Sequence, residues 1–186
     1  MDGTQPDPGP GPSPDDIAGV VDLFGALTRA ELRRALSELA FRQGAERDPE
    51  AFEAAIEAAV DSYHLVAVPA DALGNDALGD DASGDGGEHD GEADLLVAGP
   101  VAFPTLPEGG EDLPHIMDAP DRQVDREAAA AAAEEQFRAD AAAAVGAGDT
   151  GRVGTLLDVS YELEAWGPVD LGETRRRLDA ARDETN

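Results

Sequence analysis

The residue types that most often perform catalysis or bind metals are few and scattered in this sequence. Its 186 residues include no cysteine, which excludes disulfide bonds, thiol catalysis, thiolate zinc sites and iron–sulfur clusters. The three histidines, His64, His89 and His115, are too far apart for a recognisable metal-binding pattern, and neither HExxH nor HxH spacing occurs. We therefore expect no metal site and no cofactor.

Serines and carboxylates give no catalytic pattern either. No serine lies in a GxSxG motif, and no glycine-rich phosphate loop follows a predicted strand. Carboxylates are so abundant that no pair, such as Glu134 with Glu135 or Asp158 with Glu162, stands out as a general acid and base. The sequence therefore predicts a protein that is not an enzyme and has no catalytic residue.

Arginine clusters are the remaining groups that could bind a ligand. All 13 basic residues are arginines, and nine of them lie in two stretches, 29–47 and 175–182. In the first stretch two interpretations stay open: phosphate contacts, or i,i+4 ion pairs such as Glu38 with Arg42 on a solvent-exposed helix face. In the second, cations near a helix C-terminus are favourable in themselves. The candidate contacts to a partner or to phosphate are Arg29, Arg33, Arg47, Arg175 and Arg176.

The charge balance indicates the solvent in which the protein works. The chain has 24 Asp and 17 Glu against 13 Arg, for a net charge of −28. A dense carboxylate surface holds water and cations, and salt screens its self-repulsion, so this composition is typical of a halophilic archaeon. No apolar run approaches the roughly 18 residues of a membrane span, and the first sixteen residues do not resemble a secretory signal. We expect a soluble, cytoplasmic protein.

Two segments lack the apolar residues that a folded core needs. Residues 1–15 contain prolines in alternation, which block helices and strand ladders and favour an extended conformation. Residues 69–94 hold nine acids and no arginine, with little that could offset the entropy of ordering. The 12-residue spacing of a calcium-binding loop is absent from this stretch. We predict that both segments are disordered.

Two helices are predicted directly after the tail. The first is capped by one of the two acids at 15–16 and ends near Gly25. The second begins at Thr28, which forms a capping box with Glu31, and ends near Gly44. The apolar residues recur at helical spacing and are expected in the core: Ile17, Val20, Val21, Phe24, Leu32, Leu36 and Leu39.

A third helix and a hairpin come next. Asp48 caps the third helix, and Pro49 occupies its first turn. The β-branched runs 64–68 and 95–99 then predict two strands that form a hairpin with a long loop. This order of three helices and a hairpin over residues 15–104 resembles the winged-helix family. The resemblance implies that the third helix would face the DNA major groove.

The rest of the chain is predicted to be a connector and three helices. Residues 100–120 contain five prolines and the hydrophobic anchors Val101, Phe103, Leu106, Leu113, Ile116 and Met117. We expect the connector to pack extended against a surface. The first helix is predicted from Asp121 to Val145 with Gly146 as a stop, the second from a cap at Asp149 or Thr150 to Gly167, and the third over residues 171–182. The short loops between these helices favour a helical bundle.

The expected fold class is mainly α with a small β-hairpin. The predicted division is a disordered tail at 1–15, a winged-helix-like domain at 16–104 with the insert 69–94, an ordered connector at 105–120 and a helical bundle at 121–186. The whole chain also resembles a family of uncharacterised acidic haloarchaeal proteins, through LTRAELRRALSELAFRQG, LLVAGPVAFPTLPEGGEDLPHIMDAP and LLDVSYELEAWGPVDLGETRRRLDAAR. That resemblance implies a halophilic origin and no particular activity.

Two functions lead on these observations, and an enzyme ranks third, which a deep pocket with converging polar groups would favour. The leading hypothesis is a non-enzymatic module for protein interaction or regulation, with a protein partner or self-association. The alternative is a DNA-binding winged-helix regulator that uses the arginines of residues 29–47. The predicted third helix disfavours this alternative because it carries Glu50, Glu53, Glu57 and Asp61 at helical spacing, and these carboxylates would repel phosphate.

Overall fold

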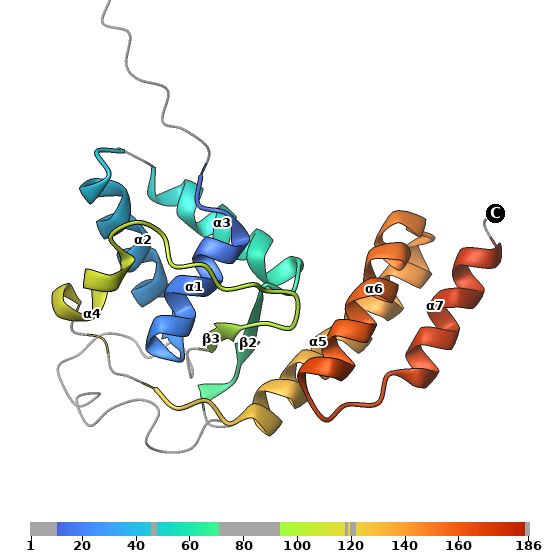
Figure 1. Cartoon of the computed structure of the whole chain (residues 1–186). Helices are drawn as coiled ribbons and strands as arrows, with labels where there is room; N and C mark the ends of the chain where they lie inside the picture. Colours follow the sequence, from blue (N-terminus) through green and yellow to red (C-terminus); the bar gives the residue numbers. More distant parts are fainter. Residues whose placement is uncertain (1–10, 46–47, 71–93, 118, 120–121, 185–186) are drawn as a thin grey trace, which may run out of the picture.

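The computed structural model describes residues 11–45, 48–70, 94–117, 119 and 122–184. These residues form a mainly helical fold with a small antiparallel sheet (Figure 1), which confirms the predicted fold class. The elements are, in order, α1 (Pro14–Phe24), β1 (Leu27–Thr28), α2 (Arg29–Arg42), α3 (Pro49–Asp61), β2 (Leu65–Val68), β3 (Leu95–Ala98), the 3-10 turn η2 (Gly110–Asp112), α4 (Leu113–Ile116), α5 (Arg126–Ala147), α6 (Thr150–Trp166) and α7 (Gly172–Glu184). The predicted disordered segments lie largely outside the described residues.

The first three helices begin where the capping signals place them, with one exception. Thr28 caps α2 in a capping box with Glu31, and Asp48 caps α3 ahead of its first-turn proline, as predicted. The cap of α1 is Ser13, which forms a capping box with Asp16. The prediction of an aspartate cap was therefore wrong. The Ser13 hydroxyl accepts a hydrogen bond from the Asp16 amide, and the Asp16 carboxylate accepts one from the Ser13 amide.

The sheet has the order β1–β3–β2, and all its pairs are antiparallel. Leu65 pairs with Ala98 and Val68 with Leu95, which confirms the predicted hairpin. The sequence did not indicate β1, whose two residues are a strand only because Leu27 pairs with Leu96 of β3.

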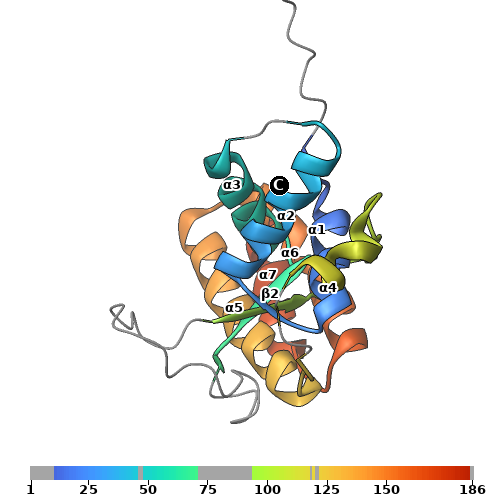
Figure 2. The same cartoon turned by 90° about the vertical axis from the view of Figure 1, so that its left-hand side faces the viewer.

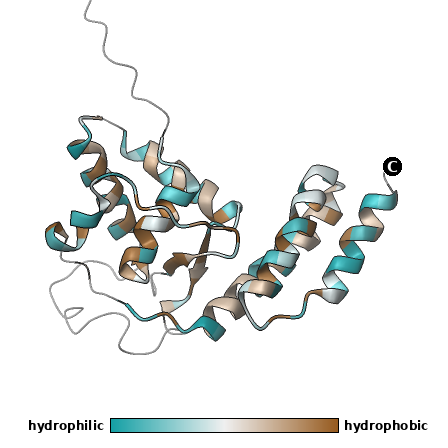
Figure 3. Ribbon diagram, in the orientation of Figure 1, coloured by the Kyte–Doolittle hydropathy of each residue, from teal (hydrophilic) through white to brown (hydrophobic). Residues whose placement is uncertain are grey.

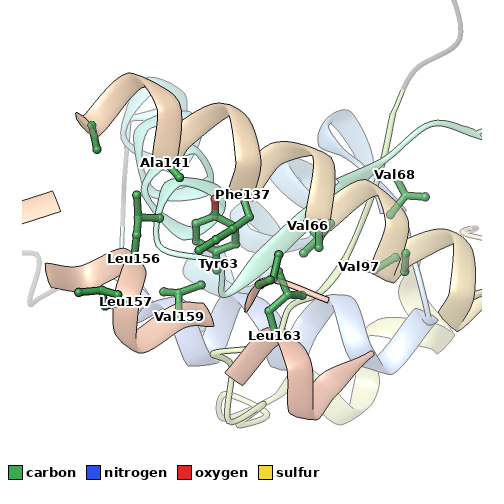
Figure 4. Close-up of a cluster of buried hydrophobic side chains, with 14 of the residues drawn as sticks. Tyr63, Val66, Val68, Val97, Phe137, Ala141, Leu156, Leu157, Val159 and Leu163 are labelled. Carbon is green, nitrogen blue, oxygen red and sulfur yellow. The ribbon is translucent and has the colours of Figure 1, made fainter. Parts of the chain in front are cut away.

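Both faces of the hairpin are buried. Leu65 and Leu96 belong to a core with α1, α2 and α3, whereas Val66 and Val97 point the other way into a core with α5, α6 and α7. Figure 2 views the molecule from the side of α1 and α2, and Figure 4 shows the second core around Phe137 and Leu163. Burial on both faces explains why the strands are unbroken apolar runs.

The C-terminal helices differ from prediction at their ends. Helix α5 begins at Arg126 after the cap Asp125, five residues later than predicted, and continues past Gly146 to Ala147. Asp149 is the cap of α6, one of the two predicted residues. Every helix in the described part of the chain is too short or too polar to cross a lipid bilayer.

The connector packs against α1 through its backbone. The amide of Thr105 donates to the carbonyl of Asp15 at 3.1 Å, and the Phe103 amide donates to the Asp15 carboxylate at 2.8 Å. Only glycine fits at position 19, since a Cβ there would lie 2.1 Å from the Thr105 carbonyl oxygen. Leu113 is a buried anchor as predicted, whereas Phe103 is 80% exposed.

The predicted anchoring role is therefore wrong for Phe103, and it holds only in part for Leu106 and Ile116, which are exposed by 41% and 42%. The connector is fixed near Phe103 by backbone hydrogen bonds, so this side chain is free to face solvent.

A buried ion pair joins the segment between the connector and α5 to α2. The Arg122 guanidinium, with its side chain 5% exposed, donates two hydrogen bonds to the Glu31 carboxylate at 2.8 and 2.9 Å and a third to the Ala26 carbonyl. The Arg122 amide also donates to the Phe24 carbonyl. Gly25 (φ +76°) allows this close approach, since a Cβ there would lie 1.9 Å from the Arg122 carbonyl oxygen.

The same contacts change the pKa of the Glu31 carboxyl group. Burial alone would raise the pKa of its carboxyl group, but the hydrogen bonds from Arg122 and the Thr28 amide, with the Arg122 charge, outweigh burial and lower the pKa below the ordinary 4.5. Because the folded-state pKa is lowered, this contribution to stability is present above pH 4.5 and is lost as the pH falls through the folded-state value.

We expect Arg122→Met to lower the free energy of unfolding by about 3 kcal/mol, because it leaves a half-buried carboxylate without its partner. Urea unfolding in about 1 M KCl measures this loss. The matched control is Arg29→Met, which removes only exposed ion pairs and costs about 0.5 kcal/mol. The difference between wild type and Arg122→Met narrows below pH 4.5. Equal losses in the two variants would contradict the central role of this pair.

Candidate functional site

The arginines of α2 that the sequence marks as candidate contacts are held by carboxylates of α3. Nη1 of Arg29 lies 2.6 Å from Oε1 of Glu57 and 3.4 Å from Oε1 of Glu53. Nη1 of Arg33 lies 3.6 Å from Oε2 of Glu53. The acids of the third helix thus neutralise the cations of the second, and a phosphate group would have to displace them.

The other arginines of this stretch do not form a cluster with them. Arg42 binds Asp112 of η2 at 2.6 Å, so its predicted i,i+4 pair with Glu38 is wrong. Arg34 is exposed and has no ion pair within the described residues. Arg47 lies outside the described part of the chain, so its role stays a prediction.

Arg175 holds α7 against α6. Its Nε donates to Oγ of Ser160 at 2.9 Å, a terminal nitrogen donates to Glu164, and the guanidinium lies 4.2 Å from the ring centroid of Tyr161. The hydrogen bond from Arg175 and a second from the Leu171 amide lower the pKa of the Glu164 carboxyl group. Arg175 is therefore engaged in contacts between α7 and α6.

Arg176, next in sequence, faces a groove between α5 and α7. The groove has a volume of about 780 Å³, within the roughly 300–1,000 Å³ of ligand sites in proteins. Its apolar residues are Ala141, Ala142 and Val145 of α5 and Leu178 of α7. Its charged residues are Arg138, Arg176, Arg177, Asp170 and Glu173.

Along this groove the arginines outnumber the carboxylates, three to two. Arg138 binds Glu134 and Arg177 binds Glu173, each pair lying on a single helix with its arginine exposed to solvent. Arg176 is exposed and has no ion pair in the described part of the chain. Exposed pairs of this kind contribute little and exchange readily with other carboxylates.

His64 lies between a serine and an aspartate. Nδ1 of His64 is 2.9 Å from Oγ of Ser62, and Nε2 is 3.8 Å from Oδ1 of Asp15. The Ser62 hydroxyl donates to the Ala58 carbonyl at 2.6 Å, and the same Asp15 oxygen accepts from the Phe103 amide. A nucleophilic serine must give its proton to the histidine, and here the carbonyls of Ala58 and Ala59 at the end of α3 lie within hydrogen-bond distance of the same hydroxyl.

Metal-ligating side chains do not converge in the described residues. No group of three or more His, Cys, Asp or Glu side chains is placed there to hold an ion. His89 and most of the acidic insert 69–94 lie outside that range.

A buried tyrosine joins α3 to the C-terminal helices. Tyr63 has φ +62°, rare for a side chain of this size, and its hydroxyl donates to Asp140 of α5 at 2.7 Å. Arg152 of α6 donates to the same carboxylate and to the Asp61 carbonyl, both at 3.0 Å. Burial, and then the hydrogen bond to Asp140, raise the pKa of the Tyr63 hydroxyl well above its ordinary 10.

Sequence reasoning missed the groove and the two structural ion-pair networks. Arg122 and Glu31 are 91 residues apart, and Tyr63 and Asp140 are 77 apart, so no local pattern connects them. The groove had one available signal: Arg138, Ala141, Ala142, Val145 and Gly146 recur at helical spacing on one face of α5.

Comparison with known proteins gives one match. The sequence pattern of a family described as "Family of unknown function (DUF7109)" matches residues 15–183. No curated protein and no solved structure matches the chain.

We expect Tyr63→Phe to cost about 1 kcal/mol of unfolding free energy at neutral pH, the usual value of a hydrogen bond. Because the folded-state pKa of Tyr63 is raised, wild-type stability also falls as the pH rises above 10. The chain has no lysine or cysteine to titrate in that range. Urea unfolding at increasing pH should therefore show an alkaline decline in wild type and in the control Tyr161→Phe, but not in Tyr63→Phe. A decline that persists in Tyr63→Phe would contradict the assignment.

Proposed function

Because the chain belongs to DUF7109, a family of unknown function that brings no activity with it, we propose from the geometry that it is a non-enzymatic module for protein interaction or regulation. The proposal places it in the cytoplasm of a halophilic archaeon. The observation that carries the proposal is the groove between α5 and α7, which combines an apolar floor with an arginine rim. Apolar surface flanked by polar groups is the composition of a protein-binding site.

The non-enzymatic part of the proposal is supported by the state of the candidate catalytic groups. The Ser62 hydroxyl lies 2.6 Å from the Ala58 carbonyl oxygen of α3, and neither Ser62 nor His64 lines the groove. Tyr63 is buried, with its hydroxyl bound to Asp140. A catalytic group must reach its substrate, and these three do not face the recess.

DNA binding is the second candidate, favoured by the order of elements. Helix, strand, two helices and a hairpin succeed one another over α1 to β3, as a winged-helix-like half would require. The charge of the relevant face argues against it, since Glu53 and Glu57 of the third helix bind the arginines of the second. DNA affinity comes largely from cations that neutralise phosphates, and molar salt removes most of that contribution.

The halophilic part of the proposal is supported by charge. A net charge of −28 on 186 residues destabilises a compact state in dilute buffer through self-repulsion. In about 1 M salt the screening length falls to about 3 Å, and this repulsion is largely removed.

We expect the melting temperature to rise steadily from about 0.1 M to about 1 M KCl, because the screening length shortens. The double variant Asp158→Asn/Glu162→Gln removes two exposed like charges one turn apart on α6. It should therefore gain melting temperature at low salt and less at high salt. A melting temperature that does not respond to KCl would remove the halophilic assignment.

Recovery of the tagged protein from its host extract in molar KCl, with and without nuclease, tests the choice between protein and DNA. We expect one partner protein to be recovered in stoichiometric amount, and its recovery to be unaffected by nuclease. Val145→Asp in the groove should lose it, whereas the matched control Ala165→Asp on the exposed side of α6 should retain it. Nucleic acid that crosslinks to wild type, and is lost when Arg29, Arg33 and Arg47 are replaced with glutamine, would establish the DNA-binding alternative instead.

A further inference from the structure

The groove runs along one face of α5 for more than two turns. The α5 residues that line it are Arg138, Ala141, Ala142, Val145 and Gly146, the i, i+3, i+4, i+7 and i+8 positions of a helical stripe. Eight residues of helix rise about 12 Å. The groove is therefore an elongated trough parallel to α5, with α7 as its second wall.

The floor of this trough lets another backbone come close. Ala141 and Ala142 have short side chains, Gly146 has none, and a Cβ at Gly146 would meet no atom within 4 Å. Helices pack with their axes about 8–10 Å apart, and closest where side chains are small. A helix laid in the trough would contact both α5 and α7 and complete a four-helix bundle with α6.

The charged residues that line the trough determine which charge a bound helix should carry. Three of the chain's 13 arginines line the trough against two carboxylates, in a chain of net charge −28. Figure 3 shows that α7, which carries two of these arginines, is hydrophilic along much of its length. Arg176 has no ion pair within the described residues, so it is available to a carboxylate of another chain. The charge complementarity points to an acidic occupant.

We propose that the trough between α5 and α7 binds an amphipathic helix of a separate partner protein, with a narrow apolar stripe flanked by Asp and Glu. This inference rests on the proposed protein-interaction function and names its partner class. The apolar stripe lies on Ala142, Val145 and Leu178, and the flanking acids bind Arg138, Arg176 and Arg177. This is the helix-in-groove mode of recognition, with anchors at i, i+3 or i+4, and i+7.

A second copy of the chain does not supply this helix from α3, its most acidic amphipathic helix. Phe52 and Ile56 of α3 are buried in the first core, so its apolar face is already covered. A separate partner is thus the better occupant.

The test uses the full-length protein in about 1 M KCl, where only short-range contacts persist, and three labelled synthetic helices of about 20 residues. One carries Leu anchors flanked by Glu, the second has Lys in place of Glu, and the third is a scrambled version of the first. We expect fluorescence anisotropy to show binding of the acidic helix alone. Arg176→Glu and Val145→Asp should each weaken it at least tenfold, and the matched control Arg34→Glu should not.

The outcomes that overturn the inference are distinct. Equal binding of the basic or scrambled helix, or no binding of any of the three, overturns the acidic-helix assignment. If the host partner is still recovered in a Val145-dependent manner, the proposed function survives that failure. A dimer detected by sedimentation in molar KCl and dissociated by Arg176→Glu would assign the trough to a second copy and also overturn the inference. Far-UV circular dichroism checks that both exposed-site variants remain folded.

Discussion

Burial of the β2–β3 hairpin on both faces is the constraint on which the rest of the structure depends. Leu65 and Leu96 require one apolar layer, which α1, α2 and α3 supply, and Val66 and Val97 require another on the opposite side. The second requirement places α5 across the hairpin. Once α5 is fixed there by Phe137 and the Tyr63 network, its remaining face is available to α6, α7 and the groove. The candidate interaction surface is thus a consequence of how the sheet is covered.

Arginines are few in this chain, and several of them form ion pairs between different secondary-structure elements. The chain has 13 arginines against 41 carboxylates, so at least 28 carboxylates would have no arginine in a one-to-one pairing. The arginines with inter-element partners hold neighbouring segments together: Arg29 and Arg33 join α2 to α3, Arg42 joins α2 to η2, Arg122 joins the segment before α5 to α2, Arg152 joins α6 to α5, and Arg175 joins α7 to α6. The groove arginines are among those outside this pattern: Arg138 and Arg177 pair only along their own helices, as Arg182 does, and Arg176 forms no ion pair in the described part of the chain, as Arg34 and Arg126 also do not.

Local signals predicted the elements, whereas long-range contacts decided the site. The Thr28–Glu31 capping box and the Asp48-Pro49 helix start each involve residues no more than three positions apart. Local sequence patterns therefore located the beginnings of α2 and α3. Strand β1 could not be predicted because its two residues acquire their conformation from β3. Phe103 was expected to be buried because it is apolar, yet backbone hydrogen bonds already fix the connector at that point. Arg175 and Arg176 were both candidate contacts, and nothing local distinguished Arg176, which lines the groove, from its neighbour Arg175, which packs on Tyr161 and binds Glu164 of α6.

Molar salt, under the proposed halophilic setting, changes what a binding site must provide. With a screening length of about 3 Å, charges no longer attract a partner from a distance, and only groups in direct contact contribute. Apolar burial keeps its strength, so the floor of the groove would supply most of the affinity. The guanidinium groups at the rim would then act through orientation and through rejection of a basic helix, which would leave Arg176 facing a like charge. An acidic protein that must recognise another acidic protein needs positive charge at one defined place, and the α5–α7 groove is where the described fold provides it.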